Sequence, residues 1–499
     1  MHFLKRQGGI SLSNLIKNEL IKIFKKKTIY ITMVIIFLLL IFMNCMFKYA
    51  NNGSEYNYYL YNEAYIESLR GELERLNPDQ PSDITTYINL LSEIQLSEMM
   101  QQYKDAEWKL AIINERIAPY ISERNTYQYG AEKNEAQVES INQEINALLA
   151  KLEENDWKYF ATADLEQANQ QLETLNQQKE QIEDTAVLHN IETEIKTAET
   201  EKEIAQYRLD KNIPYGNDYL NRAISKLETA NKNLANYDNL DKELEYEEQL
   251  EYNSYLQDQA ESRYILDTGI DINKTDSLKG ILQHFYSQFG IFLIVVIVMI
   301  AGTIVSEEFN KGTIKLLLVK PYTRNKILLA KFITTLIMIA FVIVVTIIMQ
   351  MLIGGILFGF DSLADPVVTY NFNTNTIQEM NIFANLGIQT LMQLPMIILL
   401  ATLAFAVSTI FSNSTLAITI SLLGYMSGSI INQLAIAYKL QFMKYFVTMN
   451  WDLSIYANGA LPNMEGMNMT MSMIVCAVYF LIMVIPTFIV FKKRNIKNI

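Results

Sequence analysis

The sequence predicts an all-α membrane protein with six transmembrane helices and an extracellular stalk of antiparallel, coiled-coil helices. Two observations lead to this prediction. Five apolar regions of the chain carry no charged residue, and a long segment between the first two is rich in Glu, Gln, Asn, Lys, Leu and Ala but poor in Gly and Pro. A bilayer core of about 30 Å needs roughly 20 apolar residues per helix, so each apolar region is long enough to span a membrane.

The six spans are predicted in chain order from these regions. A polar break at Ser412, Asn413 and Ser414 divides the longest region into two spans. The predicted spans are residues 28–47, 287–305, 332–360, 384–411, 415–436 and 471–491. Residues 361–383 are expected to form an extracellular loop, and residues 437–470 an extracellular or re-entrant segment.

Basic residues predict the orientation of these spans. Lys25, Lys26 and Lys27 precede the first span, and further Lys and Arg residues lie in the loop 306–331 and in the tail 492–499. Lys and Arg beside spans are retained in the cytoplasm, and all three groups lie on one side when six spans alternate. We therefore expect a multi-pass protein of the plasma membrane with both termini in the cytoplasm.

This topology places residues 48–286 outside the cell. They carry 46 acidic and 22 basic residues, a net charge of −24, whereas the rest of the chain has 19 basic and 8 acidic residues. An acidic surface repels nucleic-acid phosphates, so no nucleic acid is expected as a partner. Apolar residues recur at spacings of three and four, as in Val138, Ile141 and Ile145, which is typical of coiled-coil helices.

Turn-forming residues divide this extracellular segment. Residues 77–81 and 213–217 are expected to separate helices, and Pro119 to kink or end another. A helix of about 45 residues, or roughly 65 Å at about 1.5 Å per residue, is expected among them. Such a stalk is either a passive spacer or dimer clasp, or a device that senses or guides something outside the cell.

The chain offers no catalytic, metal or nucleotide site of its own. Cys45 and Cys476 lie at or inside apolar spans, and His2, His189 and His284 are isolated in sequence. The sequence has no phosphate-binding loop, and its predicted spans contain no Asp, Glu, Lys, Arg or His, which argues against an ion-driven carrier. The protein is therefore not expected to be an enzyme, and if it moves a cargo, a separate protein supplies the energy.

The loop 306–331 carries a pattern of charged, Gly and Pro residues. The residues of this pattern are Glu307, Glu308, Gly312, Thr313, Lys315, Leu317, Pro321, Thr323, Arg324 and Lys331. It resembles the permease subunits of ABC-2 type transporters, which carry a Glu at the end of the second span, then Gly-Thr, Lys-x-Leu-Leu and Pro-x-Ser/Thr-Arg, and a basic residue that opens the third span. The resemblance implies a coupling helix beneath the membrane, exposed to a cytoplasmic ATPase.

Local chemistry is consistent with a short helix in this loop. Ser306 is a candidate N-cap, Glu307 and Glu308 favour a first helical turn, and Pro321 is expected to end the helix. The alternative is that these residues are topology anchors, with Lys and Arg for orientation and Pro for a turn.

Residues 1–27 are expected to contain an amphipathic helix at the cytoplasmic interface. One apolar face is formed by Leu12, Leu15, Ile16, Leu20, Ile23 and Phe24, with Lys17 and Lys22 opposite. Such a helix serves at least as an anchor. In the ABC-2 permeases that the sequence resembles, it also borders the socket for the ATPase.

The resemblance covers about residues 11–47 and 287–499. It implies a permease subunit that pairs with a second copy or a paralogue, contacts membrane lipid and joins two copies of a cytoplasmic ABC ATPase. ATP and Mg²⁺ would be bound by that ATPase, and no cofactor is expected in this chain. The expected function is ATP-driven export of an apolar or amphipathic cargo, such as a peptide, lipid or drug, in a Gram-positive bacterium.

Two alternatives remain open at this point. In the first, an ABC-type mechanotransmission complex relays ATPase motion through the extracellular stalk without moving a cargo. In the second, the chain is a coiled-coil scaffold of the cell envelope without any ATPase.

Overall fold

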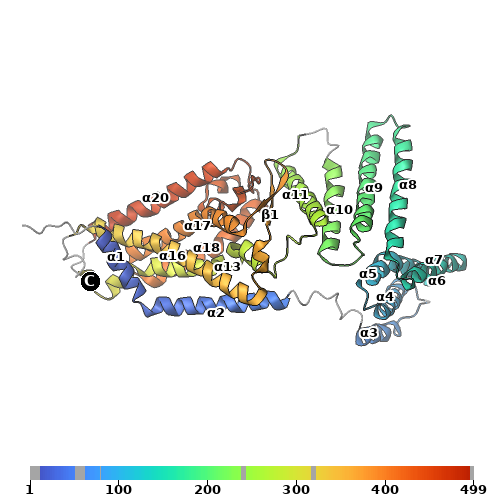
Figure 1. Cartoon of the computed structure of the whole chain (residues 1–499), viewed down its shortest axis with the longest axis horizontal. Helices are drawn as coiled ribbons and strands as arrows, with labels where there is room; N and C mark the ends of the chain where they lie inside the picture. Colours follow the sequence, from blue (N-terminus) through green and yellow to red (C-terminus); the bar gives the residue numbers. More distant parts are fainter. Residues whose placement is uncertain (1–11, 51–61, 79, 238–242, 316–321, 495–499) are drawn as a thin grey trace, which may run out of the picture. The chain divides into compact units, whose positions relative to one another are not determined.

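The computed structural model describes residues 12–50, 62–78, 80–237, 243–315 and 322–494 (Figure 1). Helices make up 79% of the structure, so the predicted all-α membrane class is confirmed. The sequence did not predict a two-stranded sheet, which is also present.

The chain divides into two compact units, which are described separately. The membrane unit comprises residues 1–51, 273–374 and 378–499, and the helical unit comprises residues 52–272 and 375–377.

In the described ranges, six helices are long and apolar enough to cross a membrane, as predicted. They are α2 (Lys27–Ala50), α13 (Phe285–Thr303), α16 (Arg324–Phe358), α17 (Ile382–Phe411), α18 (Ser414–Ala437) and α20 (Met469–Lys493). Five of them begin and end within a few residues of the predicted spans.

Helix α16 differs from the prediction at its start. The span was expected to begin at residue 332, but the helix begins at Arg324, about two turns earlier. Thr323 caps it, because its hydroxyl accepts a hydrogen bond of 3.3 Å from the backbone N–H of Lys326. The prediction counted only charge-free residues, whereas backbone hydrogen bonding continues through the charged turns. Lys331 therefore lies inside the helix and not before it.

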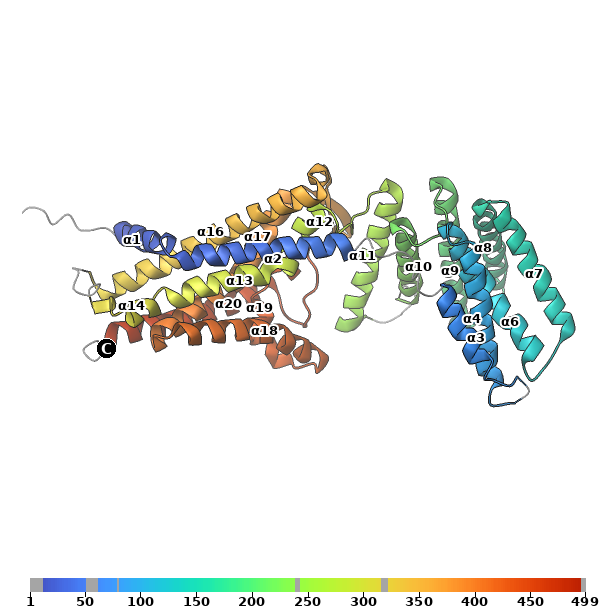
Figure 2. The same cartoon turned by 90° about the horizontal axis from the view of Figure 1, so that it is seen from below.

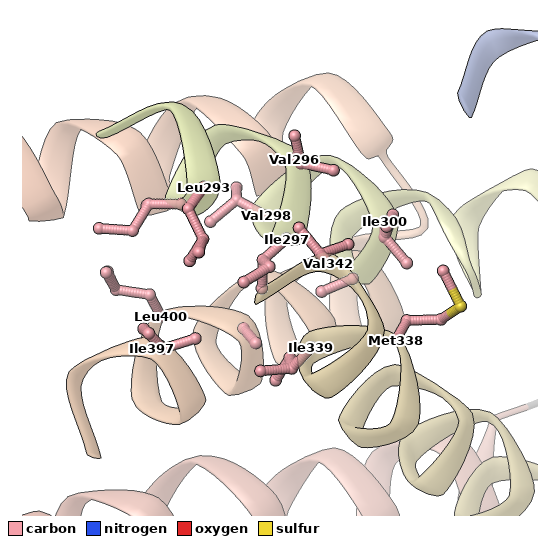
Figure 3. Packing of buried hydrophobic residues seen from close by; sticks show 14 of the residues in the cluster. Leu293, Val296, Ile297, Val298, Ile300, Met338, Ile339, Val342, Ile397 and Leu400 are labelled. Carbon is pink, nitrogen blue, oxygen red and sulfur yellow. The ribbon is translucent and has the colours of Figure 1, made fainter. Parts of the chain in front are cut away.

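The core of the membrane unit surrounds α13 and α17, which have the most buried apolar segments of the six. Figure 3 shows this packing, with side chains of α16 completing the cluster. The labelled residues are Leu293, Val296, Ile297, Val298 and Ile300 of α13, Met338, Ile339 and Val342 of α16, and Ile397 and Leu400 of α17. Helices α2, α18 and α20 keep most of their apolar side chains exposed.

One polar pair is buried between α2 and α16. The side-chain amides of Asn44 and Gln350, both fully buried, donate to each other's carbonyl oxygens at 3.2 and 2.9 Å. Reciprocal bonding satisfies both amides where no water is present, so this pair specifies how α2 packs on α16.

Short elements connect the spans. Helix α1 (Leu12–Phe24) precedes α2, α12 (Leu278–Gln283) precedes α13, and α14 (Ser306–Asn310) follows α13. The predicted loop 361–383 contains the 3-10 helix η4 (Asp361–Ala364) and a hairpin of β1 (Val367–Asn371) and β2 (Thr376–Met380). The segment 437–470 contains three short helices, η5 (Gln441–Tyr445), α19 (Val447–Asn450) and η6 (Ser454–Tyr456).

The membrane unit has two distinct ends. Strand β2 leads into the start of α17. The starts of α17 and α13 lie side by side, and the Tyr286 hydroxyl of α13 donates to Thr390 Oγ1 of α17 at 2.7 Å. Helix α14 instead follows the end of α13. We call these the hairpin end and the α14 end.

The helical unit consists of helices that follow one another along the chain. They are α3 (Glu63–Leu73), α4 (Ile84–Gln102), α5 (Glu107–Ile112), the π-helix η3 (Ile113–Ile117), α6 (Ala118–Tyr129), α7 (Glu135–Glu153), α8 (Trp157–Lys179), α9 (Thr185–Lys211), α10 (Tyr219–Tyr237) and α11 (Tyr246–Thr268). From α8 to α11, each helix packs against the next in antiparallel order (Figures 1 and 2). The breaks predicted at 77–81 and 213–217 are confirmed.

Two details of the predicted helices are wrong. The longest helix described in this unit has 27 residues, not about 45. One unexpected break follows α7, where Asn155 adopts a left-handed φ of 57° and Asp156 Oδ1 accepts hydrogen bonds from two backbone N–H groups that start α8. Pro119 lies in the first turn of α6, which directly continues the π-helix η3, so the helical run does not end at this residue.

Candidate functional site

Helix α14 is joined by hydrogen bonds to three spans, α13, α17 and α18. Ser306 Oγ donates to the carbonyl of Gly302 at 2.8 Å and lies 2.6 Å from Ser414 Oγ at the start of α18. Its backbone N–H donates to Ser408 Oγ of α17 at 3.2 Å. Ser306 is therefore not the predicted N-cap, because the helix already includes it and its hydroxyl bonds back into the preceding turn.

Glu308 of α14, Lys331 of α16 and Glu19 of α1 meet in a buried ion cluster. The Lys331 ammonium donates to Glu19 Oε2 at 2.6 Å, to Glu308 Oε1 at 3.3 Å and to the carbonyl of Ile304 at 3.0 Å. The exposed fraction of the side chain is 1% for Lys331, 7% for Glu19 and 11% for Glu308. All three ammonium hydrogens have acceptors, which is the condition under which a buried charge is tolerated.

A second layer of lysines surrounds this cluster on its exposed side. Lys22 donates to Glu19 at 2.9 Å and to Glu308 at 2.8 Å. Glu307 accepts from Lys26 at 2.9 Å and from Lys311 at 3.1 Å. Helix α1 and Lys26, which lies between α1 and α2, are thus joined to α14 by ion pairs.

The chain turns sharply after α14. Gly312 adopts a φ of 66°, in the left-handed region that disfavours residues with a side chain. The turn returns Thr313 to the cluster, where its hydroxyl donates to a carboxylate oxygen of Glu308. Gly312 is therefore a turn residue, and Thr313 is part of the cluster.

Electrostatics of α14 favour ionised carboxylates. Burial alone would raise the pKa of Glu308, but Lys331, Lys22 and Thr313 outweigh it and lower that pKa to about 2. The pKa of Glu307 is also lowered, because Lys26 and Lys311 outweigh its partial burial. Burial opposes the charge of Lys22, yet Glu308 and Glu19 raise its pKa. The ion pairs therefore persist at neutral pH.

Other predicted coupling residues lie outside the cluster. Lys315 is exposed. Arg324 donates to the carbonyls of Lys492 and Arg494, at 3.1 and 2.6 Å, and so caps the end of α20. Pro321, which was expected to end the coupling helix, lies outside the described residues.

The predicted interface residues of α1 contact the core of the membrane unit. Leu15 is buried, and Leu20 and Phe24 are partly buried against the main apolar cluster. The Phe24 ring meets the Phe341 ring of α16 edge to face, with centroids 5.1 Å apart. Helix α1 therefore packs on α16 through apolar contacts as well as through the ion cluster.

Glu19 was missed by the sequence analysis. It lies one turn after Leu15 and one turn before Ile23, so helical spacing places it on the apolar face. An acidic residue on an apolar face predicts a buried basic partner, and this could have suggested Lys331. Lys331 was included in the motif but was taken as the residue before the span.

A pocket of about 430 Å³ adjoins the cluster and is lined by residues of α1, α14 and the turn that follows. Its charged walls consist of the residues already paired above and Lys25. Among the described residues, no group of three or more His, Cys, Asp or Glu side chains could hold a metal ion. The arrangement is suited to mechanical connection between helices.

Parts of the chain are similar to known proteins. Residues 249–497 match a family model described as a protein of unknown function, DUF2705. The chain is 33% identical over 255 residues to the uncharacterized protein YhcI of Bacillus subtilis strain 168. The aligned region covers 51% of this chain and 77% of YhcI. It is 24% identical over 235 residues to the uncharacterized membrane protein YdbK of the same strain. That aligned region covers 47% of this chain and 88% of YdbK. No solved structure matches the chain.

Proposed function

The chain belongs to the family of the Bacillus subtilis protein YhcI, and we propose that it is the membrane subunit of an ATP-driven exporter of the ABC-2 type. In this proposal, the chain couples a separate cytoplasmic ATPase to the export of an apolar or amphipathic cargo. The observation that carries the proposal is the buried cluster of Glu19, Glu308 and Lys331, which joins a short peripheral helix to a membrane span.

The ion cluster supports a coupling role because it resists separation. Removing one partner of a buried ion pair costs about 3–5 kcal/mol, since the remaining charge stays buried without compensation. Helices α1, α14 and α16 therefore tend to move as one body when α14 is displaced. A displacement of α14 by a partner is then passed directly to the span α16.

An exposed surface beside the cluster suits a partner. Asn310, Lys311, Gly312 and Lys315 are all exposed at the turn after α14. We propose that this turn inserts into an acidic groove on the ATPase, with two ATPase copies serving a dimer of permeases. ATP and Mg²⁺ are bound by those subunits.

The charge distribution supports the orientation. The α14 end carries the basic groups and is proposed to face the cytoplasm together with both termini. The strongly acidic helical unit is proposed to lie outside the plasma membrane as an antiparallel, coiled-coil stalk.

One face of α18 is available for lipid or for a second permease copy. Leu423, Met426, Ile430 and Leu434 recur at spacings of three and four, and each is at least half exposed. A row of large apolar side chains at this spacing is typical of a helix that contacts lipid or another span.

Co-purification tests the proposal. The full-length chain is isolated from its native membranes in mild detergent, and bound proteins are identified by mass spectrometry. An ATPase with a phosphate-binding loop is expected to co-purify with the wild type and to be reduced at least tenfold by Lys311→Glu combined with Lys315→Glu.

The matched control is Lys104→Glu combined with Lys133→Glu, which changes the charge equally at exposed positions of the helical unit. This control is expected to retain the ATPase. Absence of an ATPase from the wild-type preparation, or equal retention by both double variants, would contradict the proposal.

A further inference from the structure

We infer that the hairpin end of the membrane unit holds a binding site for a short amphipathic peptide segment without negative charge. A cavity of about 930 Å³ lies there, between the starts of α13 and α17, the end of α18, the β1–β2 hairpin and the short helices that follow α18. Small-molecule pockets typically enclose about 300–1,000 Å³, so the cavity lies at the upper end of that range and is large enough for a few residues.

Two buried polar atoms at this cavity have no partner in the chain. Asn385 of α17 is 7% exposed, and its Nδ2 makes no hydrogen bond. Thr369 of β1 also lines the cavity, and its buried Oγ1 is likewise unpaired. A buried polar group without a partner costs about 1–3 kcal/mol, so a ligand that supplies an acceptor to Asn385 and a donor to Thr369 recovers that loss.

The remaining walls combine amides with adaptable apolar side chains. Gln378, Gln389 and Asn463 add further amide groups, and Met392, Met396, Met426 and Met449 add flexible thioethers. Amides offer a donor and an acceptor to each peptide unit, while methionine adapts its shape to varied apolar side chains. This combination fits a peptide backbone with apolar side chains.

The charge of the lining residues favours a peptide over a phospholipid as the ligand. No lysine or arginine occurs among the lining residues, all of which belong to the described part of the chain, so a phosphate group would find no cation there. The one carboxylate, Asp452, already accepts hydrogen bonds from Gln393 at 2.8 Å and from the backbone N–H of Ser454 at 2.9 Å. Its negative charge disfavours anionic ligands further.

The inference rests on the proposed function only where the bound peptide is taken to be a segment of the exported cargo. The cavity lies at the opposite end of the membrane unit from the ion cluster. Ligand binding can therefore be measured on the isolated full-length chain without an ATPase. Failure of binding and failure of ATPase co-purification are then separate results.

Trp451 lines the cavity and provides a fluorescent reporter. Trp108→Phe and Trp157→Phe remove the other tryptophans of the chain, both of which lie in the helical unit. In this background, the probe is a neutral hexapeptide of alternating leucine and glutamine, acetylated and amidated at its ends. A saturable change in Trp451 fluorescence is expected on titration with this peptide.

A matched pair of variants on α18 tests where the peptide binds. Ser427 and Ser429 are both exposed and both donate to a backbone carbonyl of their own helix, but only Ser429 lines the cavity. Ser429→Phe is expected to weaken peptide binding at least tenfold, and Ser427→Phe to leave it unchanged. Asn385→Leu, which removes the unpaired donor, is expected to weaken binding about tenfold.

Three results would overturn the inference. The first is the absence of a saturable response in a protein whose circular dichroism is unchanged. The second is an equal effect of Ser427→Phe and Ser429→Phe. The third is a saturable fluorescence response to lysophosphatidylglycerol but not to the peptide, lost in Ser429→Phe. That result would assign the cavity to lipid.

Discussion

Replacing Lys331 by Met is expected to release α1 from the membrane unit. The Lys331 ammonium holds Glu19 at 2.6 Å and Glu308 at 3.3 Å while only 1% of its side chain is exposed. Lys331→Met leaves two buried carboxylates with Lys22, whose side chain is 46% exposed, as their shared cation. The loss of a buried partner costs about 3–5 kcal/mol, and we take the lower value because Lys22 remains.

Thiol labelling measures this release. The background carries Cys45→Ser and Cys476→Ala, and Ile23→Cys places a single thiol on the buried face of α1, where Ile23 is 3% exposed. Labelling by N-ethylmaleimide then reports the fraction of time that α1 is undocked. About 3 kcal/mol corresponds to roughly a hundredfold faster labelling in Lys331→Met.

Two comparisons make the result specific. Lys326→Met removes the same charge from an exposed position of α16 and is expected to leave the labelling rate unchanged. Lys331→Met combined with Glu19→Leu replaces the ion pair by apolar groups and is expected to recover most of the protection, because such replacements are often neutral. Equal labelling rates for Lys331→Met and Lys326→Met would refute the reasoning.

The remaining predictions concern pH and the buried amide pair. The pKa of Glu308 is lowered from 4.5 to about 2, so the stabilisation it gives is complete above about pH 4.5 and is lost as the pH falls toward 2. Hydrogen–deuterium exchange of α1, corrected for the intrinsic rate, is expected to stay constant from about pH 7 to 5 and to rise below about 4.5. A rise already at pH 6 would disagree with the lowered pKa. Asn44→Leu leaves Gln350 buried without its partner and is expected to cost about 1–3 kcal/mol, seen as a lower midpoint of thermal unfolding in detergent. Asn44→Leu combined with Gln350→Leu is expected to restore much of that loss, and an additive loss would show that the pair is not coupled.

The sequence predicts spans and turns well, because both depend on local composition. Apolar length identifies the six candidate spans, and the Pro- and Gly-containing segments at 77–81 and 213–217 do separate helices. The break at Asn155 was missed because an Asn in the left-handed region with an Asp cap has no Pro or Gly to mark it. The hairpin of β1 and β2 was missed because two five-residue strands lie within one short loop between spans.

The candidate site was only partly predictable, since its partners are far apart in the chain. Glu308 and Thr313 were identified by their spacing, and the structure brings Glu308 to Lys331 and Thr313 to Glu308. Glu19 lies more than three hundred residues away from Lys331, and no local pattern connects them. Arg324 belongs to the same motif as Glu308 but caps α20 instead, because the start of α16 lies beside the end of that helix.

Photo-crosslinking from the turn after α14 tests the central claim most directly. A photoreactive amino acid is introduced at Lys315, which is exposed beside the ion cluster, and at Lys133 of the helical unit as the control. After illumination of intact cells, Lys315 is predicted to form an adduct with an ATPase that contains a phosphate-binding loop, and Lys133 is predicted to form none with it. The absence of such an adduct from Lys315, or the same adduct from Lys133, would contradict the claim that α14 couples this membrane protein to a cytoplasmic ATPase.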